Sequence, residues 1–370
     1  MTLIKQTDLD QSSDEDLFVH KLIMVDKGQT PLRIDKFLMD RLENVSRNRV
    51  QNAISSGAIV VNDKEVKSNY KVRPLDQIAV ILPGDPNEET ELEPQNIPLD
   101  VVYEDDSVMV INKPAGLVVH PGSGNWDGTL VNGLLYYFNS KNLPVMEGNT
   151  KQRPGLVHRI DKDTSGLMVI AKSEFAMTHL SKQFFDHTID RTYHALVWGE
   201  PKEDSGTIEG NIGRHPRERM QMTVFEEAEE GKEAITHYEV LEKFYYVTYL
   251  KCKLETGRTH QIRVHMKHIG CTLFNDERYG GNRILKGTVF TKYRQFVENC
   301  FDLLPRQALH AQSLGFEHPV TKERMIFELA PPEEFMQLLD KWRNYKETRK
   351  ETLYADELSD EEVVNPNDLK

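Results

Sequence analysis

Apolar residues recur first at helical spacing and then at strand spacing between residues 30 and 83. A first helix is predicted by a three-to-four-residue apolar period at Ile34, Phe37, Leu38 and Leu42. Ser46 is a typical N-cap and Gly57 a typical C-terminal stop, so a second helix is expected between them. The run 59–61, the Asn62-Asp63 turn and Val66 predict a hairpin, and residues 78–81 a further strand.

Beyond residue 99, apolar runs that favour strands alternate with short helical stretches up to about residue 330. The clearest strand candidates are residues 107–111, 167–171, 193–198 and 246–254. Sequential strands with loops of varied length predict a mixed, mostly antiparallel sheet with a central cleft, in an α+β fold. A terminal amphipathic helix is predicted by the i, i+3, i+4, i+7 spacing of Phe335, Leu338, Leu339 and Trp342.

Composition shifts along the 370 residues divide the chain into two domains, a linker and two tails. We expect an acidic, disordered tail over 1–18, a small domain over 19–83 and a linker rich in Pro, Glu, Asp and Asn over 84–98. A larger domain is expected over 99–345, and a flexible acidic tail over 346–370.

The net charge of −13 conceals a basic region. Acidic residues concentrate in 1–18, 84–106, 226–233 and 346–370, which leaves the remaining chain positive. Residues 251–294 hold ten Lys and Arg against three Asp and Glu. Because a phosphate backbone responds to a local basic surface, this balance is compatible with nucleic-acid binding, although ordinary surface variation would produce it too.

The composition argues against several other classes of protein. No apolar run approaches 18 residues, and the N-terminus lacks the basic and apolar regions of a signal peptide, so neither a membrane helix nor secretion is expected. Three widely spaced cysteines fit a reducing cytoplasm. His260, His265 and His268 lack the spacing of a zinc site, and Gly122-Ser123-Gly124 lacks the third glycine of a dinucleotide fingerprint, so no metal and no nucleotide cofactor are expected.

A polar nonapeptide lies between two apolar stretches near the middle of the chain. It reads His158-Arg159-Ile160-Asp161-Lys162-Asp163-Thr164-Ser165-Gly166. A carboxylate held rigidly between buried strands is typical of an acid, base or nucleophile, and its burial must be offset by a partner. A turn or N-cap aspartate explains the local pattern equally well, because Asp, Ser and Gly together often mark turns.

Three further motifs decide between these interpretations. They are Asn112-Lys113-Pro114-Ala115-Gly116 and the residues up to Gly122, Arg191-Thr192-Tyr193-His194-Ala195-Leu196-Val197, and Leu254-Glu255-Thr256-Gly257-Arg258-Thr259-His260-Gln261-Ile262-Arg263-Val264-His265. With the nonapeptide, they resemble the RluA-type family of RNA pseudouridine synthases, in particular its D-type branch, over about residues 20–340. The segment 275–280 also resembles the family, except that Asn275 stands where a glycine is usual, which puts the turn geometry in question.

The resemblance implies a catalytic role for three residues. Asp161 matches the catalytic aspartate, with Ile160 where leucine is usual, a swap of similar volume. A carboxylate at this place would add to the pyrimidine ring, bond the sugar carbon or remove a proton, and the sequence leaves these paths open. Arg258 matches the arginine expected to pair with Asp161, with a surface phosphate contact as the alternative. Tyr193 matches the active-site tyrosine, where a half-buried strand aromatic is the alternative.

The resemblance also implies residues that contact the substrate. Arg159 is expected to fill the space left by the flipped nucleotide, with a salt bridge to Asp163 or a phosphate as the alternative. His158, Lys113 and Arg263 are expected at the RNA. The helix–helix–hairpin order of residues 19–83 resembles an S-four-type RNA-binding domain, although a merely solubilising domain remains possible. Its expected RNA contacts are Arg33, Arg47, Arg49 and Lys64.

We therefore expect a cofactor-independent enzyme that isomerises uridines of large-subunit (23S) ribosomal RNA, acting in the cytoplasm as a monomer. Its partner would be ribosomal RNA, with no membrane and no metal involved. Three alternatives stay open: a transfer-RNA substrate, a ribosome-assembly factor that binds RNA without catalysis, and a nucleoside hydrolase that uses the same carboxylate.

Overall fold

The computed structural model describes residues 17–42, 47–55, 58–62, 64–83, 92–122, 125–139, 143–145, 153–218, 220–225, 230–288 and 290–361. In these ranges, every helix is too short or too polar to cross a lipid bilayer. Residues 1–16, 84–91 and 362–370 lie outside the described residues, and with them most of the predicted N-terminal tail, about half of the predicted linker and the end of the predicted C-terminal tail. The same is true of Ser46 and Gly57, which were expected to delimit the second helix.

The N-terminal unit packs two helices, α1 (Ile34–Met39) and α2 (Arg47–Ser55), against a small sheet. Its strands are β1 (Leu17–Met24), β2 (Ile59–Val61), β3 (Lys64–Glu65) and β4 (Gln77–Pro83), in the order β1-β4-β2-β3. The predicted helical face of Ile34, Phe37 and Leu38 is fully buried in the core of this unit. The sequence did not predict β1, which pairs with β4 along its whole length.

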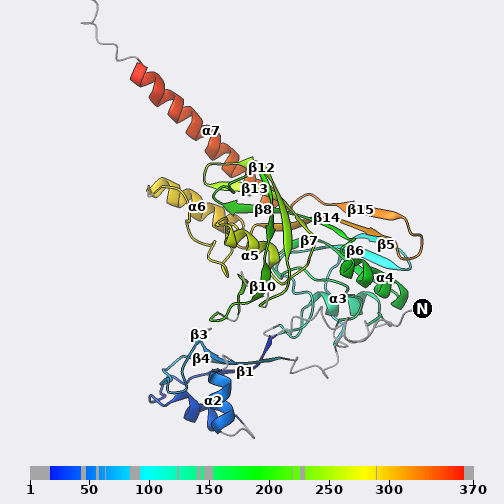
Figure 1. The fold of residues 1–370 in the computed structure, drawn as a ribbon, viewed down its shortest axis with the longest axis vertical. Coiled ribbons are helices and arrows are strands. Elements are labelled where there is room, and N and C mark those ends of the chain that lie inside the picture. The colour runs from blue at the N-terminus through cyan, green and yellow to red at the C-terminus, as the bar shows by residue number, and fades with distance from the viewer. Residues whose placement is uncertain are drawn as a thin grey trace, which may run out of the picture.

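A large mixed sheet is the main element of the remaining structure (Figure 1), and β10 (Asn211–Arg214) and β11 (Met222–Phe225) form a separate two-stranded sheet. Among the described residues the large sheet has nine strands, in the order β5-β6-β7-β14-β8-β13-β12-β9 with β15 paired to β14. All described pairs are antiparallel except β7 with β14. Its strands are β5 (Asp100–Glu104), β6 (Val108–Lys113), β7 (Ser165–Ala171), β8 (Asp190–Trp198), β9 (Ser205–Glu209), β12 (Ile235–Lys243), β13 (Val247–Leu254), β14 (Leu309–Glu317) and β15 (Arg324–Glu328). The predicted α+β fold with a mixed, mostly antiparallel sheet is confirmed.

The central strands read as continuous apolar runs because both faces of the sheet are covered. On β6, Met109 and Ile111 face the cluster that contains α3 (Leu130–Tyr137). Val108 and Val110 face the opposite cluster, which contains α4 (Glu174–Phe185). Alternation of side chains along a strand then buries every position, which is the pattern of a sheet covered on both sides.

The C-terminal helices pack at the other end of the sheet. They are α5 (Gln261–His268), α6 (Thr291–Leu303) and α7 (Glu333–Glu361). The predicted apolar face of α7, including Phe335 and Trp342, is buried with Trp198 and Phe274. Figure 1 shows α7 extending well beyond the sheet. Its backbone is helical to Glu361, so much of the segment that we expected to be a flexible tail is helical.

Two chain segments meet closely where β7 begins. Ser165 pairs with His310 and Gly166 with Ala311 in the parallel contact between β7 and β14. A Cβ atom on Gly166 would lie 2.2 Å from the carbonyl oxygen of Ala311, and the φ angle of Gly166 is +117°. Only glycine fits such a conformation at such a distance. This contact fixes the end of the loop that carries Asp161.

Candidate active site

Asp161 lies in the loop that leads into β7, between the two apolar stretches that flank it in the sequence. The loop begins after Leu156, which bridges to Ile170, and turns at Asp161, whose carbonyl accepts a hydrogen bond from the Thr164 amide at 3.1 Å. Asp161 is therefore a turn residue, as the alternative interpretation of the motif predicted. The side chain of Asp161 is 22% exposed, so the carboxylate is both held by the fold and accessible.

Lys113 joins the loop of Asp161 to the loop that follows β6. The side chain is 0% exposed, and its ammonium donates hydrogen bonds to the carbonyl oxygens of Pro114, Leu117 and Lys162, at 2.8, 2.9 and 2.9 Å. Burial lowers the pKa of Lys113 to about 7, while one acceptor for each ammonium proton favours the charged form. The expectation that Lys113 contacts RNA is corrected: its charge is used to join two loops.

His158 is likewise a structural residue. Its Nε2 accepts a hydrogen bond from the Val169 amide at 3.0 Å, and its ring stacks on Phe184 at a centroid distance of 4.7 Å. Burial lowers the pKa of His158 to about 3, so the imidazole is neutral and its nitrogen is free to accept. This geometry does not support the predicted RNA contact, because the ring is used to hold the loop against β7 and α4.

Arg263, in the first turn of α5, is the arginine that pairs with Asp161. Its Nη1 donates to Asp161 Oδ2 at 2.9 Å. On its other edge, Nε and Nη2 bind the two carboxylate oxygens of Asp276 at 2.7 and 2.9 Å. Asp276 is fully buried, and this two-point contact fixes the plane of the guanidinium toward Asp161. Asn275 adopts a φ of +57°, a conformation that Asn tolerates as glycine does, and so places Asp276 correctly.

The charges around Asp161 keep it ionised. Burial would raise its pKa, but nearby cationic groups lower the pKa to about 2. The main ones are His260, when it is protonated, and Arg263, through both its charge and its hydrogen bond. His260 itself is neutral at pH 7, since burial lowers its pKa to about 3. The compensating cation is therefore Arg263, whose own pKa is raised by the two carboxylates although burial opposes this.

The predicted pairing of Arg258 with Asp161 is not what the structure shows. Arg258 precedes α5, and its Nε donates to the carbonyl oxygen of Glu233 at 2.9 Å while its amide donates to Gln261 Oε1 at 2.9 Å. Arg263, five residues later in the first turn of α5, contacts the loop of Asp161 instead. Arg263, which had been expected to contact RNA, takes the place predicted for Arg258 beside Asp161.

Tyr193 lies near Asp161, but within the described residues no hydrogen bond joins the two side chains. It lies on β8, is buried, and pairs across the sheet with Cys252 and Ala311. Burial raises the pKa of its hydroxyl, and the charge of Asp161 raises it further. The hydroxyl is thus within electrostatic range of the carboxylate, and the catalytic role of Tyr193 stays a prediction. Arg159 is exposed, and its charge also lowers the pKa of Asp161.

Two further residues complete the site. His260 Nε2 lies 3.9 Å from Asp161 Oδ1, and His260 Nδ1 lies 2.7 Å from the Tyr279 hydroxyl. Sequence reasoning missed the roles of Asp276 and Tyr279, and had considered His260 only as a metal ligand. The signal was present in segment 275–280, which resembles the family and places an acid and an aromatic three residues apart. No cluster of metal-ligating side chains occurs within the part of the chain that the structure describes.

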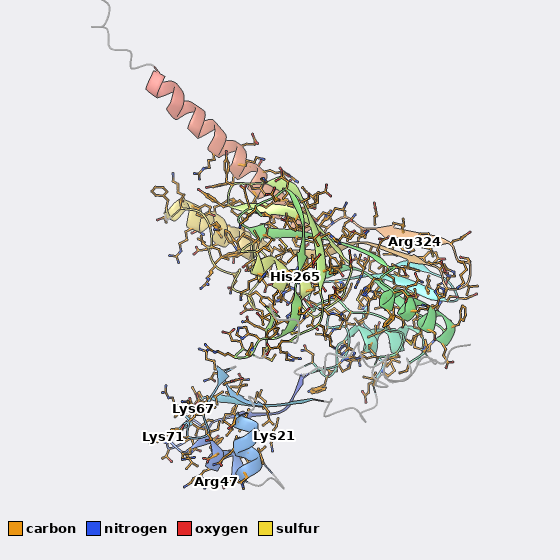
Figure 2. All side chains as sticks on the ribbon, in the orientation of Figure 1. Lys21, Arg47, Lys67, Lys71, His265 and Arg324 are labelled. Carbon is orange, nitrogen blue, oxygen red and sulfur yellow. The ribbon has the colours of Figure 1, made fainter. Side chains whose placement is uncertain are left out.

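The basic residues of the N-terminal unit divide into two groups. Arg33 and Arg47 bind the buried carboxylate of Asp35, with shortest distances of 2.9 and 3.0 Å, and both remain partly exposed. Their first role is to compensate this carboxylate, whose pKa is lowered chiefly by Arg33. Lys64, on β3, is exposed, as are Lys67 and Lys71; Figure 2 shows Lys21, Arg47, Lys67 and Lys71 spread over this unit. The side chain of Arg49 lies outside the described residues.

Comparison with known proteins identifies both parts of the chain. Residues 107–268 match the RNA pseudouridylate synthase family, and residues 32–78 match the S4 domain. An uncharacterized RNA pseudouridine synthase of Chlorobaculum parvum is 47% identical over 86% of this chain and 96% of its own length. Ribosomal large subunit pseudouridine synthase D of Zymomonas mobilis is 40% identical over 84% and 93%. The solved structure of human RNA pseudouridylate synthase domain containing 4 shares the fold, with a TM-score of 0.50 at 22% identity over 66% and 93% of the two chains.

Proposed function

Because the chain belongs to the RNA pseudouridylate synthase family, we propose that it converts specific uridines of large-subunit (23S) ribosomal RNA to pseudouridine. The ribosomal substrate is supported by relatives whose names specify the large ribosomal subunit and which align over most of both chains. The observation that carries the proposal is the ionised, accessible Asp161 that Arg263 holds in place.

The reaction requires little more than this carboxylate and a bound RNA. The bond between ribose C1′ and uracil N1 breaks, the base turns, and C1′ bonds to C5; N1 gains a proton and C5 loses one. Asp161 acts on the sugar or the base, and Arg263 keeps it charged and oriented. Tyr193 would stack on the uracil, and exposed Arg159 would occupy the space from which the base is flipped.

The N-terminal unit would hold the RNA at a distance from the chemistry. Exposed Lys64, Lys67 and Lys71 are available for backbone phosphates, whereas Arg33 and Arg47 have only their exposed parts to offer. We propose further that the protein acts as a monomer in the cytoplasm, without a cofactor. Sedimentation of the purified protein at micromolar concentration tests the monomer: a concentration-dependent increase in mass would exclude it.

The test of function maps pseudouridine, position by position, in ribosomal RNA from cells that lack the gene and from cells that carry Asp161→Asn. The expected result is the same missing positions in both strains, restored by the wild-type gene. Modification that is unchanged in both would exclude the proposal. Losses in transfer RNA alone would indicate the other substrate.

The remaining alternatives predict different outcomes. Full rescue of every deletion defect by Asp161→Asn would indicate an assembly factor that needs no catalysis. Release of free uracil from an RNA fragment by the purified protein would indicate a hydrolase.

A further inference from the structure

His260 adopts a costly backbone conformation beside Asp161. It precedes α5 with a φ of +57°, in the left-handed region that non-glycine residues rarely adopt. Such conformations persist only where the surrounding structure imposes them, and they cluster at functional sites. Here the effect is to turn the imidazole toward Asp161, with 14% of the side chain exposed.

Tyr279 determines which imidazole nitrogen carries the proton. The hydroxyl oxygen of Tyr279 accepts a hydrogen bond from the Met222 amide at 3.0 Å and lies 2.7 Å from His260 Nδ1. These are the hydroxyl's two contacts within the described residues, and Tyr279 is buried. Its own proton must therefore go to Nδ1, because an unpaired buried hydroxyl is costly. The remaining proton of the neutral imidazole is on Nε2.

The Nε2–H group lies beside the carboxylate of Asp161 but is not hydrogen-bonded to it. Nε2 lies 3.9 Å from Asp161 Oδ1, beyond hydrogen-bond distance, whereas Oδ2 is occupied by Arg263. Among the described residues, neither Asp161 Oδ1 nor the uncharged Nε2–H donor has a hydrogen-bond partner, and both side chains are partly exposed. A charged imidazolium would instead compete with Arg263 for the negative charge of Asp161.

We propose that His260 is a catalytic residue whose neutral Nε2–H donates a hydrogen bond to a carbonyl oxygen of the target uracil. When the C1′–N1 bond breaks, its electron pair stays with the uracil, and the negative charge spreads onto the ring carbonyls. The donor stabilises this charge, and no proton is transferred to or from His260. A neutral imidazole of lowered pKa polarises substrate carbonyls in this way in other enzymes. This role rests on the proposed function.

Three substitutions of His260 separate a donor from a structural role. In His260→Gln, the side-chain amide can place an N–H near the position of Nε2. In His260→Asn, the amide is too short to do so, but Asn tolerates a positive φ best. His260→Ala removes the donor altogether. If the residue only shapes the backbone, Asn is the best replacement; if it donates from Nε2, Gln is.

The assay is single-turnover formation of pseudouridine in a large-subunit ribosomal RNA fragment with enzyme in excess, together with the Kd for the same fragment and the melting temperature. We expect Gln to retain the rate to within about tenfold and Asn and Ala to lose about 100-fold or more, the typical cost of removing one such donor. Kd should change by less than about threefold. His268→Asn, at the exposed end of α5, serves as the control and should leave the rate unchanged.

A second variant tests the tautomer without touching the imidazole. Tyr279→Phe frees Nδ1 to carry the proton, and the rate should fall several-fold while Kd stays constant. An Asn variant as active as wild type, or a Gln variant as inactive as Ala, would overturn the role of His260 while wild-type activity still supported the proposed function. Wild type that forms no pseudouridine on any ribosomal fragment would overturn both.

Discussion

Replacing Arg263 with glutamine tests whether this residue lowers the pKa of Asp161 and holds its carboxylate in place. The guanidinium binds Asp161 at one edge and the buried Asp276 at the other. Its removal leaves two carboxylates without their shared cation. Breaking a buried pair by removing one partner costs about 3–5 kcal/mol, against a total stability of about 5–15 kcal/mol for a folded domain. The variant should therefore fold, with a lower midpoint in urea.

The effect on the pKa of Asp161 follows from the same contact. An adjacent arginine lowers the pKa of an aspartate by roughly one to three units. Without Arg263, the pKa should rise from about 2 to between roughly 3 and 5. At pH 7 the carboxylate would still be ionised, so any loss of rate there reflects its altered position. Near pH 4, a large share of Asp161 would be protonated and inactive.

The measurement is the single-turnover rate of pseudouridine formation between pH 4 and pH 8. Wild type should show no loss from Asp161 protonation in this range, whereas Arg263→Gln should lose rate as the pH falls toward 4. The same pKa shift makes stability depend on pH. Because the pKa of Asp161 is lower in the folded protein, the ion pair stabilises the fold fully at pH values above 3.8, the ordinary pKa. This contribution is lost as the pH falls through about 2.

Arg258→Gln is the matched control, because Arg258 precedes the same helix but binds a backbone carbonyl instead. Its pH profile should keep the wild-type shape. If Arg258→Gln produced the acid limb and Arg263→Gln did not, the assignment of the pairing arginine would be refuted.

Five other substitutions test the roles of His158, Gly166 and Lys64, and the last two are each paired with a comparison variant. His158→Ala should lower the free energy of unfolding by roughly 1–3 kcal/mol, because a buried amide loses its acceptor, with RNA affinity unchanged in filter binding; an affinity loss without a stability loss would contradict this. Gly166→Ala should cost roughly 2 kcal/mol or more in urea unfolding from backbone overlap and strain, whereas Gly116→Ala, with a positive φ but open space, should cost about 1 kcal/mol; equal costs would argue against the close contact. Lys64→Ala should reduce the slope of the logarithm of the RNA-binding constant against the logarithm of the salt concentration by about 0.7–0.9 per lost phosphate contact, without changing stability. Arg47→Ala should instead chiefly destabilise the N-terminal unit, by roughly 1–3 kcal/mol. The reverse result would make Lys64 the structural residue and Arg47 the RNA contact.

Local periodicity predicted the helices and the hairpin of the N-terminal unit, several central strands and the terminal helix. The apolar face of α1 and the terminal helix were readable because a helix places every third or fourth residue on one side. The central strands were readable as apolar runs because the fold covers both faces of the sheet. Strand β1 was missed because its pairing with β4 joins residues about sixty positions apart, and no local pattern records such a partner.

The amino-acid sequence by itself determined the fold class and the family, and it singled out Asp161 as the carboxylate that we propose to be catalytic. Periodic patterns and short motifs carry this information, and they can be recognised without knowing which distant residues they contact. Tertiary structure alone decided which charges are available. Lys113, His158 and Arg263 all carry polar groups that look free in the sequence, and each is engaged by a partner from another segment. Burial and ion pairing depend on which segments meet, and this is why Arg263, five residues after Arg258, pairs with Asp161 in its place.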